Sequence, residues 1–357
     1  MLIVTAMSGG VDSSVAAYLL KKQGHEVIGL FMSSGIETTA CTGKKLCCSA
    51  EDARDARRTA EKIGIPFYSV DFSLDFDKLI RYFCDEYNAG RTPNPCIICN
   101  QELKFGKLLE YANSIGADAI ATGHYASVVK INGRFSIKRA KDPLKDQSYV
   151  LFSLSQEQLS RTVLPLGGII KTEIRRIAAD ANLPVKDKPE SQDVCFVPDN
   201  DYRTLLERRT PGAAKRGEVR DTAGKLLGYH NGFQFYTIGQ RQGLGIALGK
   251  PAYVIRIDAA SNTVVLGDDK ELFKDRLTAD KLNWTSINGL KETESIDVLA
   301  QIRYHHTAAK ATVHYAGPDS VTAVFNEPQR AITPGQAVVF YDNEGVVIGG
   351  GWISKNE

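Results

Sequence analysis

Three cysteines of this chain have the spacing and surroundings that thiol chemistry needs. Cys96 and Cys99 form a C-x-x-C pair in the proline-containing segment RTPNPCIICN, and Cys195 follows much later in SQDVCFVP. Buried apolar cysteines are one explanation. A structural zinc site is a second, but it needs four ligands and the sequence has no matching second C-x-x-C. Sulfur chemistry is the third: a persulfide carrier with a partner thiol, or an iron–sulfur cluster held by three cysteines.

The remaining cysteines give weaker signals. The chain has seven cysteines, an odd number, and several are adjacent or spaced C-x-x-C. In a cytosolic chain this pattern favours catalysis, redox chemistry or metal binding over structural disulfides. Cys41, Cys47 and Cys48 could contribute to a zinc site, but their spacing is irregular. We interpret Cys47 and Cys48 as structural, or as a secondary redox or metal pair.

A second chemical element begins the chain, where the sequence reads LIVTAMSGGVDSSVAAYLL. Residues 2–7 predict a buried strand, and residues 13–22 have the apolar spacing of a helix. Gly9 and Gly10 let the backbone approach a ligand, and the helix N-terminus favours phosphate. The loop lacks the lysine of a Walker loop and the third glycine of the dinucleotide fingerprint. A simpler explanation is a tight turn with Asp12 or Ser13 as the helix N-cap.

The first half of the sequence alternates strand and helix patterns. This α/β alternation predicts a doubly wound parallel sheet with its ligand site at the carboxyl ends of the strands. We expect further strands at residues 27–32, 67–72 and 117–130, and helices at residues 49–63 (capped by Ser49), 75–88 and 102–115. The two prolines in residues 91–100 argue against a regular helix there. Asn132-Gly133 predicts a hairpin turn.

The second half of the sequence has a different texture. Residues 203–225 carry seven basic side chains against three acidic ones. Farther on, short strand patterns recur regularly, from AYVIRID and TVVLGD to VVIGGGWI, which predicts a small antiparallel β-barrel. We therefore expect a nucleotide-binding catalytic domain at residues 1–200, a small central domain at 201–265 and a C-terminal barrel at 266–357.

Overall composition narrows the function classes. The chain has 357 residues, 43% of them hydrophobic, and a net charge of +2, which fits a globular protein of two or three domains. Contact with nucleic acid would have to use local positive charge, such as that of residues 203–225. We find no signal peptide and no run long enough to cross a membrane, so we expect a cytoplasmic protein without a membrane partner.

A family resemblance joins these features. MSGGVDSS resembles the pyrophosphate loop (PP-loop) of the ATP pyrophosphatase superfamily, whose members cleave ATP to AMP and pyrophosphate while activating a carbonyl oxygen. The segments GLFM, GRTPNPC-x-x-CN, KFG, GADAIATGHYA, KDQSY, CF, YTIGQRQGLGI and IRY follow in order and span nearly the whole chain. Together they resemble the MnmA family of bacterial tRNA-specific 2-thiouridylases.

The resemblance implies a role for particular residues. It places ATP at Ala6, Met7, Ser8, Gly9, Gly10, Val11, Asp12, Ser13, Met32 and Gly123. It makes Cys99 the nucleophile and Cys195 the carrier of the persulfide. It places the target base at Asn94, Pro95 and Cys96. It implies tRNA contacts at His124, Lys145, Asp146, Gln147, Arg303, Tyr304 and Gln336, and it makes the central domain a tRNA-binding domain.

The implied reaction is ATP-dependent 2-thiolation of the wobble uridine in the anticodon stem-loop of lysine, glutamate and glutamine tRNAs. Uracil O2 is a poor leaving group, so its attack on ATP would form an adenylate, with Mg²⁺ and the helix terminus stabilising the phosphates. The persulfide of Cys195 would deliver sulfur to C2, and Cys99 would release it through a Cys99–Cys195 disulfide. Both thiols must act partly as thiolates, and the base must leave the anticodon stack. The sulfur donor would be a cysteine desulfurase or a relay protein.

One departure from the family concerns Cys96, since some members have aspartate there. Cys96, Cys99 and Cys195 offer three thiolates that suit a [4Fe–4S] cluster with one open iron for sulfide. This route competes with the persulfide. Three rival functions are a small-molecule adenylating amidotransferase, a non-catalytic RNA-binding module that senses ATP, and a 2-thiocytidine tRNA enzyme. The C-x-x-C pair and the basic segment argue against the first, and the barrel and GRTPNPC argue against the last.

Overall fold

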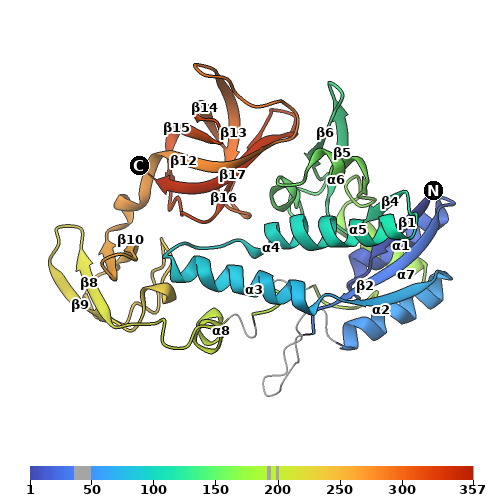
Figure 1. Ribbon diagram of the computed structural model, residues 1–357, viewed down its shortest axis with the longest axis horizontal. Coiled ribbons are helices and arrows are strands. Elements are labelled where there is room, and N and C mark those ends of the chain that lie inside the picture. Colours follow the sequence, from blue (N-terminus) through green and yellow to red (C-terminus); the bar gives the residue numbers. More distant parts are fainter. Residues whose placement is uncertain (36–49, 191–193, 198–200, 357) are drawn as a thin grey trace.

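The structure is a computed structural model that describes residues 1–35, 50–190, 194–197 and 201–356. Cys41, Cys47, Cys48 and the predicted cap Ser49 lie outside the described residues. Figure 1 shows three units: a parallel sheet with its helices, a small middle sheet and a barrel.

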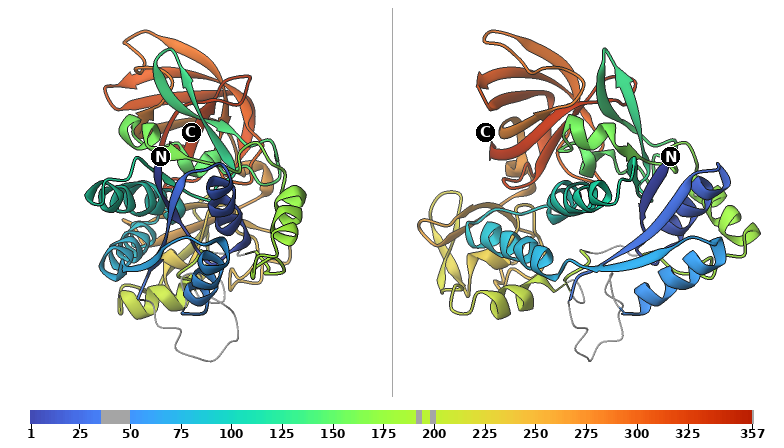
Figure 2. Two further views of the ribbon diagram at one scale, coloured as in Figure 1. Left: turned by 90° about the vertical axis from the view of Figure 1, so that its right-hand side faces the viewer. Right: turned by 45° about the vertical axis from the view of Figure 1, so that its right-hand side comes forward.

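A parallel sheet of five strands forms the first unit, in the order β3-β2-β1-β4-β7 (Figures 1 and 2). Its strands are β1 (Leu2–Ala6), β2 (Glu26–Ser33), β3 (Phe67–Asp71), β4 (Ala119–Ala121) and β7 (Thr162–Val163). The helices around it are α1 (Val11–Lys22), α2 (Ala50–Ile63), α3 (Ser73–Asn88), α5 (Leu108–Ser114) and α7 (Lys171–Asp180). The predicted doubly wound α/β fold is confirmed.

The apolar run of β1 is explained by burial on both faces. Ile3 packs with Ala17 of α1 and Ala56 of α2 in one core cluster. Its neighbour Val4 points to the other face and packs in the cluster that contains Leu79 of α3. Because successive side chains of a strand point to opposite faces, helices on both sides require a strand that is apolar throughout.

The predicted strand at residues 117–130 is wrong in its middle. The chain leaves the sheet after β4 and pairs again as a hairpin of β5 (Ala126–Ile131) and β6 (Arg134–Arg139). In the break, Gly123 packs so closely on α1 that an added Cβ would lie 2.6 Å from the backbone nitrogen of Ser13. The hairpin turn is confirmed, with positive φ at Asn132 (50°) and Gly133 (82°).

The expectation of no regular helix in residues 91–100 is wrong from Pro95 onward. α4 (Pro95–Ile98) starts with Pro95 in its first turn, where the missing N–H costs no hydrogen bond. The helix continues as a π-helix, η1 (Cys99–Lys107), and then as α5. π-helical turns are rare and are frequently found at functional sites, and this one begins at Cys99.

The middle unit is mainly β-structure, and the barrel consists of β-strands joined by loops. The middle sheet has the order β10-β11-β8-β9, and the barrel closes in the order β12-β15-β14-β13-β16-β17, which confirms the predicted barrel. The middle unit contains α8 (Tyr202–Arg209), β8 (Gly217–Asp221), β9 (Leu226–His230), η4 (Phe233–Phe235), β10 (Tyr253–Asp258), β11 (Thr263–Gly267) and η5 (Asp269–Leu272). The barrel strands are β12 (Phe273–Trp284), β13 (Ser295–Gln301), β14 (Ala309–Gly317), β15 (Ser320–Arg330), β16 (Ala337–Tyr341) and β17 (Val347–Asn356). Two short helices, η2 (Ser148–Leu151) and α6 (Gln156–Ser160), precede β7.

Two strands that the sequence pattern places in the barrel lie elsewhere. β10 and β11, the segments AYVIRID and TVVLGD, belong to the middle sheet. The reason is that β11 pairs in parallel with β8, and Val264 of β11 packs against Val219 of β8 in a separate core. Parallel pairing between strands distant in sequence has no local signal in a run of hairpin-like segments.

The barrel is fastened to the segment that leads into α4. The backbone nitrogen of Thr92 donates to the carbonyl oxygen of Pro334 over 2.9 Å. Gln336 Nε2 donates to the carbonyl oxygens of Thr92 and Pro93, over 2.9 and 3.1 Å. We call these contacts between residues 92–93 and 334–336 the barrel clamp.

We expect the Gly335→Ala variant to be destabilised by about 1–3 kcal/mol. Gly335 has φ = +89°, and an added Cβ would lie 2.9 Å from the backbone of Thr92. Thermal unfolding of the purified variant measures the loss. Gly24→Ala is the matched control, because Gly24 has φ = +86° and open space around it. An equal loss in both variants would mean that only backbone strain, and not the clamp, is affected.

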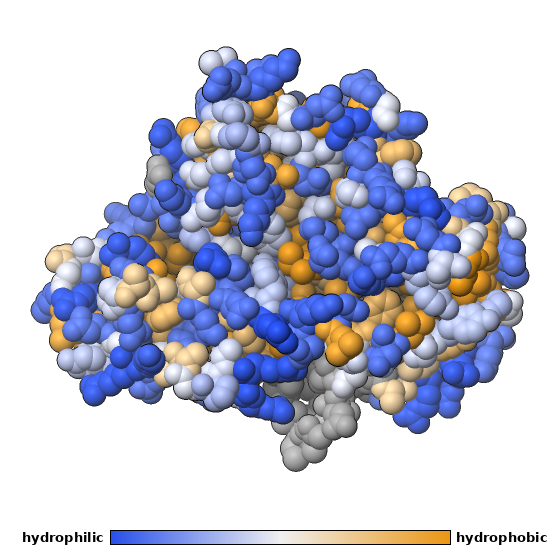
Figure 3. Space-filling model, in the orientation of Figure 1, coloured by the Kyte–Doolittle hydropathy of each residue, from blue (hydrophilic) through white to orange (hydrophobic). Residues whose placement is uncertain are grey.

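Hydrophilic residues predominate on the face drawn in Figure 3, with smaller apolar patches between them. Within the described parts of the chain, no helix has both the length and the apolar character needed to cross a membrane.

Candidate active site

The loop after β1 is shaped by its two glycines. Gly9 has φ = +74°, and an added Cβ would lie 2.3 Å from the carbonyl oxygen of Asp52, so only glycine fits. The predicted caps Asp12 and Ser13 are wrong, since α1 begins at Val11 with Gly10 as its N-cap and without a side-chain cap bond. The hydroxyl of Ser14 instead donates back to the carbonyl oxygen of Gly10, over 2.8 Å. No side chain caps the first turn of α1, and an uncapped helix start is suited to binding an anion through its N–H groups.

A buried lysine supplies the cation that the loop itself lacks. Lys171, the first residue of α7, is only 9% exposed, and its Nζ lies 2.7 and 2.9 Å from the carboxylate oxygens of Asp12. The hydroxyl of Tyr125 donates to the same carboxylate over 2.6 Å. Burial and the neighbouring Asp12 raise the pKa of Tyr125, so it stays protonated as a donor. A carboxylate and an ammonium group therefore stand together at the end of β1.

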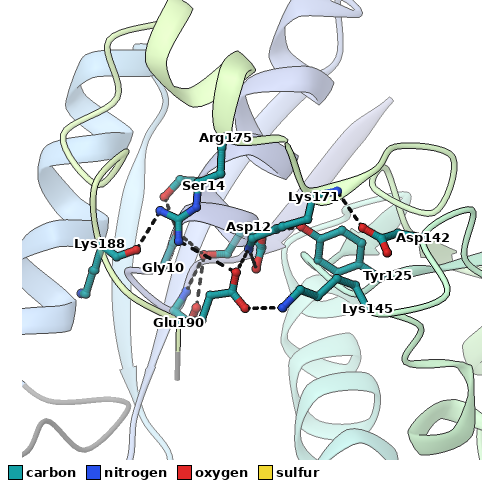
Figure 4. Close-up of polar contacts among 12 residues, drawn as sticks. Gly10, Asp12, Ser14, Tyr125, Asp142, Lys145, Lys171, Arg175, Lys188 and Glu190 are labelled. Carbon is teal, nitrogen blue, oxygen red and sulfur yellow. Dashed lines mark hydrogen bonds and ion pairs between the residues drawn. The ribbon is translucent and has the colours of Figure 1, made fainter. Parts of the chain in front are cut away.

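Glu190 extends this cluster from Lys171 to Lys145 (Figure 4). Its carboxylate pairs with Lys145 Nζ at 2.6 Å and with Lys171 Nζ at 3.0 Å. Burial opposes ionisation of Glu190, but the hydrogen bonds from the two lysines outweigh it, and its pKa is lowered. Glu190 is therefore a carboxylate at neutral pH, and it orients two cations that come from distant parts of the chain.

A second lysine holds the loop from the side of α2. Lys188 Nζ donates to the carbonyl oxygen of Gly9 over 2.9 Å and pairs with Asp52 at 2.7 Å and Asp55 at 2.6 Å. Partial burial by itself would lower the pKa of Lys188, but the bonds to the two aspartates raise it, so the group stays charged. Sequence reasoning missed Lys171, Lys188 and Glu190, because no spacing rule relates them to the loop. The charged run KDKPE just before SQDVCF is the only local signal.

One cavity of about 600 Å³ brings the two chemical elements together. It is lined by most of the residues predicted for ATP: Ala6, Met7, Ser8, Gly10, Val11, Asp12, Ser13, Met32 and Gly123. Its wall also includes Pro95, Cys96, Cys99, His124, Lys145, Gln147, Cys195 and Tyr304 from the other predicted groups. Gly9, Asn94, Asp146, Arg303 and Gln336 are not among its lining residues. The loop after β1 and the three cysteines therefore line the same cavity.

The three cysteines differ in accessibility. Cys96 is exposed and Cys195 is half-buried, whereas Cys99 is 8% exposed and carries a free thiol. Burial raises the pKa of Cys99, an effect that the charge of Lys104 partly opposes. Cys99 is thus a neutral thiol near pH 7, whereas the role that the resemblance implies needs a thiolate.

The [4Fe–4S] route finds no support in these positions. Among the described residues no group of three or more cysteine, histidine, aspartate or glutamate side chains is close enough to hold a metal ion. Although Cys96, Cys99 and Cys195 line one cavity, they do not form a ligand set here. We therefore derive no step through a cluster.

Alkylation of Cys99 by iodoacetamide should become faster as pH rises, and should continue to rise above the ordinary thiol range. The reason is that the thiolate is the reactive form and burial raises the pKa of this thiol. Lys104→Met should slow the reaction about threefold to tenfold at pH 8 by removing a favourable charge. Mass spectrometry of the Cys99 peptide gives the rate. Lys107→Met is the control, because Lys107 lies on the same π-helix but pairs with Glu110. A rate independent of pH above 8 would contradict a raised pKa.

His124 lies deep in the cavity wall. Its Nδ1 is 2.7 Å from the hydroxyl oxygen of Thr122, and its ring lies 5.9 Å from that of Phe105. Burial lowers the pKa of His124 well below its usual value, so the ring is neutral. A tRNA contact at His124 therefore requires a nucleotide inside the cavity.

The residues predicted to contact tRNA from the loop before η2 have different surroundings. Lys145 pairs with Glu190 at the cavity. Gln147 accepts a hydrogen bond from the backbone nitrogen of Tyr125 over 2.9 Å. Asp146 accepts hydrogen bonds from the backbone of Ala140 and from the hydroxyl of Ser148, over 2.9 and 2.7 Å. Asp146 therefore shapes the loop, and its direct contact with tRNA stays a prediction.

The barrel contributes Arg303 and Tyr304 through a turn after β13. Gln301 Nε2 donates to the carbonyl oxygens of both residues, over 3.0 and 2.8 Å, and so fixes this turn. Tyr304 reaches the cavity together with His305. Burial raises the pKa of Tyr304 to about 12, and the nearby groups Asp146 and Cys96 add smaller effects in the same direction. Gln336 belongs to the barrel clamp and orients residues 92–93.

The basic segment 203–225 is partly neutralised within the protein. Arg209 pairs with Asp77 of α3, Arg220 pairs with Glu218, and Arg203 donates to the carbonyl oxygen of Phe235. The guanidinium of Arg216 lies 4.2 Å from the ring centre of Tyr229. Arg208, Lys215 and Lys225 are exposed. Contact of this segment with tRNA phosphates stays a prediction. Fewer of its basic side chains are available for that contact than the seven counted in the sequence.

Comparison with known families gives three matches that together cover nearly the whole chain. Residues 1–199 match the family described as tRNA methyl transferase HUP domain. Residues 203–268 match tRNA methyl transferase PRC-barrel domain, and residues 274–353 match aminomethyltransferase beta-barrel domain.

Curated relatives are similar over the same length. The chain is 49% identical to the tRNA-specific 2-thiouridylase MnmA of Clostridium acetobutylicum, over 98% of this chain and 99% of that protein. It is 48% identical to the tRNA-specific 2-thiouridylase MnmA of Clostridioides difficile, over 99% and 98%. A 4-thiouridine synthetase solved with RNA and bound ATP is a distant match, with 21% identity, a TM-score of 0.37, and coverage of 59% of this chain and 51% of that one. The identity over nearly the full length of both sequences shows that the chain belongs to the MnmA family of tRNA-specific 2-thiouridylases.

Proposed function

We propose that this protein is a tRNA-uridine 2-sulfurtransferase that uses ATP to replace O2 of a tRNA uridine by sulfur. One observation carries the proposal: a single cavity is lined by the phosphate-type loop after β1 and by Cys96, Cys99 and Cys195. The reaction must activate O2 of the uridine and then deliver sulfur to C2, the carbon that carries O2. The loop and the cysteines must therefore both lie within reach of one base. The family relationship supports the same activity.

ATP would bind with its phosphates at the N-terminus of α1. The unpaired N–H groups behind Gly10 suit the phosphate oxygens, and Gly123 lets β4 approach this turn closely. Mg²⁺ would enter as part of the ATP complex. Lys171 would then place its ammonium group on the pyrophosphate, which leaves when uridine O2 attacks the α-phosphate.

Sulfur transfer would follow on the adenylated base. The terminal sulfur of a Cys195 persulfide attacks C2, and AMP leaves with the former O2. The Cys99 thiolate then attacks the inner sulfur of Cys195, so the S–S bond to the base breaks and 2-thiouridine is released with a Cys99–Cys195 disulfide. An external thiol reduces this disulfide. A cysteine desulfurase or a relay protein would reload Cys195.

The substrate would be the wobble uridine of tRNAs for lysine, glutamate and glutamine, and the reaction would take place in the cytoplasm. The depth of His124 and Cys99 supports a base that leaves the anticodon stack and enters the cavity. The central unit would contact the tRNA backbone through exposed basic residues such as Arg208, Lys215 and Lys225.

The test uses purified protein with MgATP, a sulfur donor and an unmodified lysine tRNA transcript. Nucleoside mass spectrometry measures 2-thiouridine, and a coupled assay measures pyrophosphate. We expect one 2-thiouridine per tRNA, formed only with ATP. Pyrophosphate release with a soluble metabolite and no tRNA would favour an adenylating amidotransferase. Formation of 2-thiocytidine would favour the related cytidine enzyme, and tRNA binding without any modified nucleoside would leave an RNA-binding module.

A further inference from the structure

We propose that Leu144 is an apolar wedge that enters the anticodon stack when the target base moves into the cavity. This inference rests on the proposed tRNA substrate. Leu144 lines the cavity, yet it is 89% exposed, more than any other large apolar side chain in the described residues. A lone exposed leucine is ordinary on protein surfaces, so the proposal depends on how and where this one is held.

The loop that carries Leu144 is fastened to α7. Asp142 Oδ1 accepts a hydrogen bond from the backbone nitrogen of Leu144 over 3.1 Å, and Asp142 Oδ2 accepts one from the backbone nitrogen of Lys171 over 2.9 Å. Figure 4 shows Asp142 beside the start of this helix. Pro143 restricts φ between these contacts. The position of Leu144 is thus set by the same helix that places Lys171 at the phosphate loop.

The other end of the loop is closed as well. Asp146 Oδ1 accepts from the backbone nitrogen of Ala140 over 2.9 Å, and the backbone nitrogen of Lys145 donates to the carbonyl oxygen of Asp142 over 3.1 Å. These bonds hold the backbone of a tight turn in one conformation. Its most apolar side chain, Leu144, is nevertheless exposed and is not packed in the core. Ordering a chain costs conformational entropy. Burial of Leu144 against a partner would provide a favourable free energy that offsets this cost.

The surroundings of Leu144 favour RNA as that partner. Lys145 and Gln147 follow it on the same loop, and Tyr304 and His305 of the barrel line the same cavity. When a base leaves a stack, its neighbours lose their contact, and apolar side chains such as leucine fill such gaps in bound nucleic acids. Leu144 is therefore placed to hold the gap open while the uridine occupies the cavity.

The test compares Leu144→Ala with the wild-type protein on an anticodon stem-loop that carries 2-aminopurine next to the target uridine. Wild-type binding should raise the fluorescence several-fold, because the reporter base loses its stacking partner. Leu144→Ala should lose at least half of this rise, and single-turnover 2-thiolation should slow about tenfold. Leu144→Met should retain both signals, since it keeps an apolar side chain of similar length.

Two controls separate a wedge from other roles. Leu74→Ala removes another highly exposed leucine (78%) that lies on α3 and does not line the cavity, and it should change nothing. A stem-loop with an abasic site beside the uridine has no stack to open, so it should restore the rate of Leu144→Ala to that of the wild type, which a merely structural defect would not allow.

The outcomes also separate this inference from the proposed function. If the wild-type protein forms no 2-thiouridine, the function itself fails. If the wild type is active and Leu144→Ala matches it in fluorescence and rate, the wedge is overturned. If Leu144→Ala slows only the reaction fed by a protein sulfur donor, and not the one fed by inorganic polysulfide, which transfers sulfane sulfur to Cys195 without a donor protein, the leucine docks the donor protein and the wedge is likewise overturned.

Discussion

Cys99→Ala should form 2-thiouridine at least about a thousandfold more slowly than the wild type, because it removes the thiol that releases sulfur from Cys195 in the proposed mechanism. Pyrophosphate release in the presence of tRNA should continue, since the phosphate loop and Lys171 are untouched. Nucleoside mass spectrometry and a pyrophosphate assay on the same reaction measure the two steps. After one round of pyrophosphate and AMP release, the variant should therefore accumulate tRNA joined to Cys195 through a disulfide at C2.

Cys84→Ala is the matched control for this loss. Cys84 is a buried thiol of α3, and burial raises its pKa to about 11, so it shares the neutral state of Cys99 but does not line the cavity. It should retain the wild-type rate of thiolation and lose only the stability of a small core truncation. Full activity of Cys99→Ala would contradict the proposed role and would leave Cys96 as the partner of Cys195.

Lys171→Met should lower the turnover number for pyrophosphate release by about a hundredfold to a thousandfold, comparable with the loss of one preorganised charge at a leaving group. The reason is that Lys171 is the buried cation beside Asp12 where the loop has no lysine of its own. Steady-state pyrophosphate release with saturating tRNA measures the effect. Lys171→Arg should recover part of the rate, because it keeps a positive charge at a different reach.

A second measurement distinguishes a contact with pyrophosphate from mere support of Asp12. If Lys171 binds the leaving group, Lys171→Met should bind pyrophosphate at least about tenfold more weakly while its affinity for AMP stays near wild type. Lys62→Met, an exposed lysine at the end of α2, is the control. Equal weakening of AMP and pyrophosphate would show that the substitution has disturbed the loop as a whole, and the proposed contact would be withdrawn.

The parts of the fold that could be predicted are those with a local pattern. The strand–loop–helix unit at residues 2–22 follows from an apolar run, two glycines and helical spacing. The hairpin at Asn132-Gly133 follows from turn residues that tolerate positive φ. The barrel follows from short strands at regular intervals, although the same pattern wrongly includes β10 and β11, because parallel pairing with β8 depends on distant residues.

The parts of the site that could not be predicted depend on tertiary contacts. Lys171 meets Asp12 only because α7 packs beside α1, and Glu190 joins the cluster through Lys171, so the spacing of these residues in the sequence does not predict a phosphate site. The prolines near Cys96 indicate an irregular loop, but Pro95 serves as the first turn of a helix that becomes π-helical at Cys99. The low accessibility of Cys99 likewise depends on the packing of whole elements, and it changes the expected charge of the thiol.

The barrel clamp also bears on the order in which the protein is made. The parallel sheet and the phosphate loop lie early in the chain, but the contacts that orient residues 92–93 come from Pro334 and Gln336, near its end. Domains tend to fold as they leave the ribosome, the N-terminal one first. A nascent or truncated chain that stops before residue 334 contains the residues of the nucleotide site. It lacks the hydrogen bonds that hold residues 92–93, the segment that leads to Cys96 and Cys99. Translation itself thus delays assembly of the thiol end of the cavity until the whole protein has been synthesised.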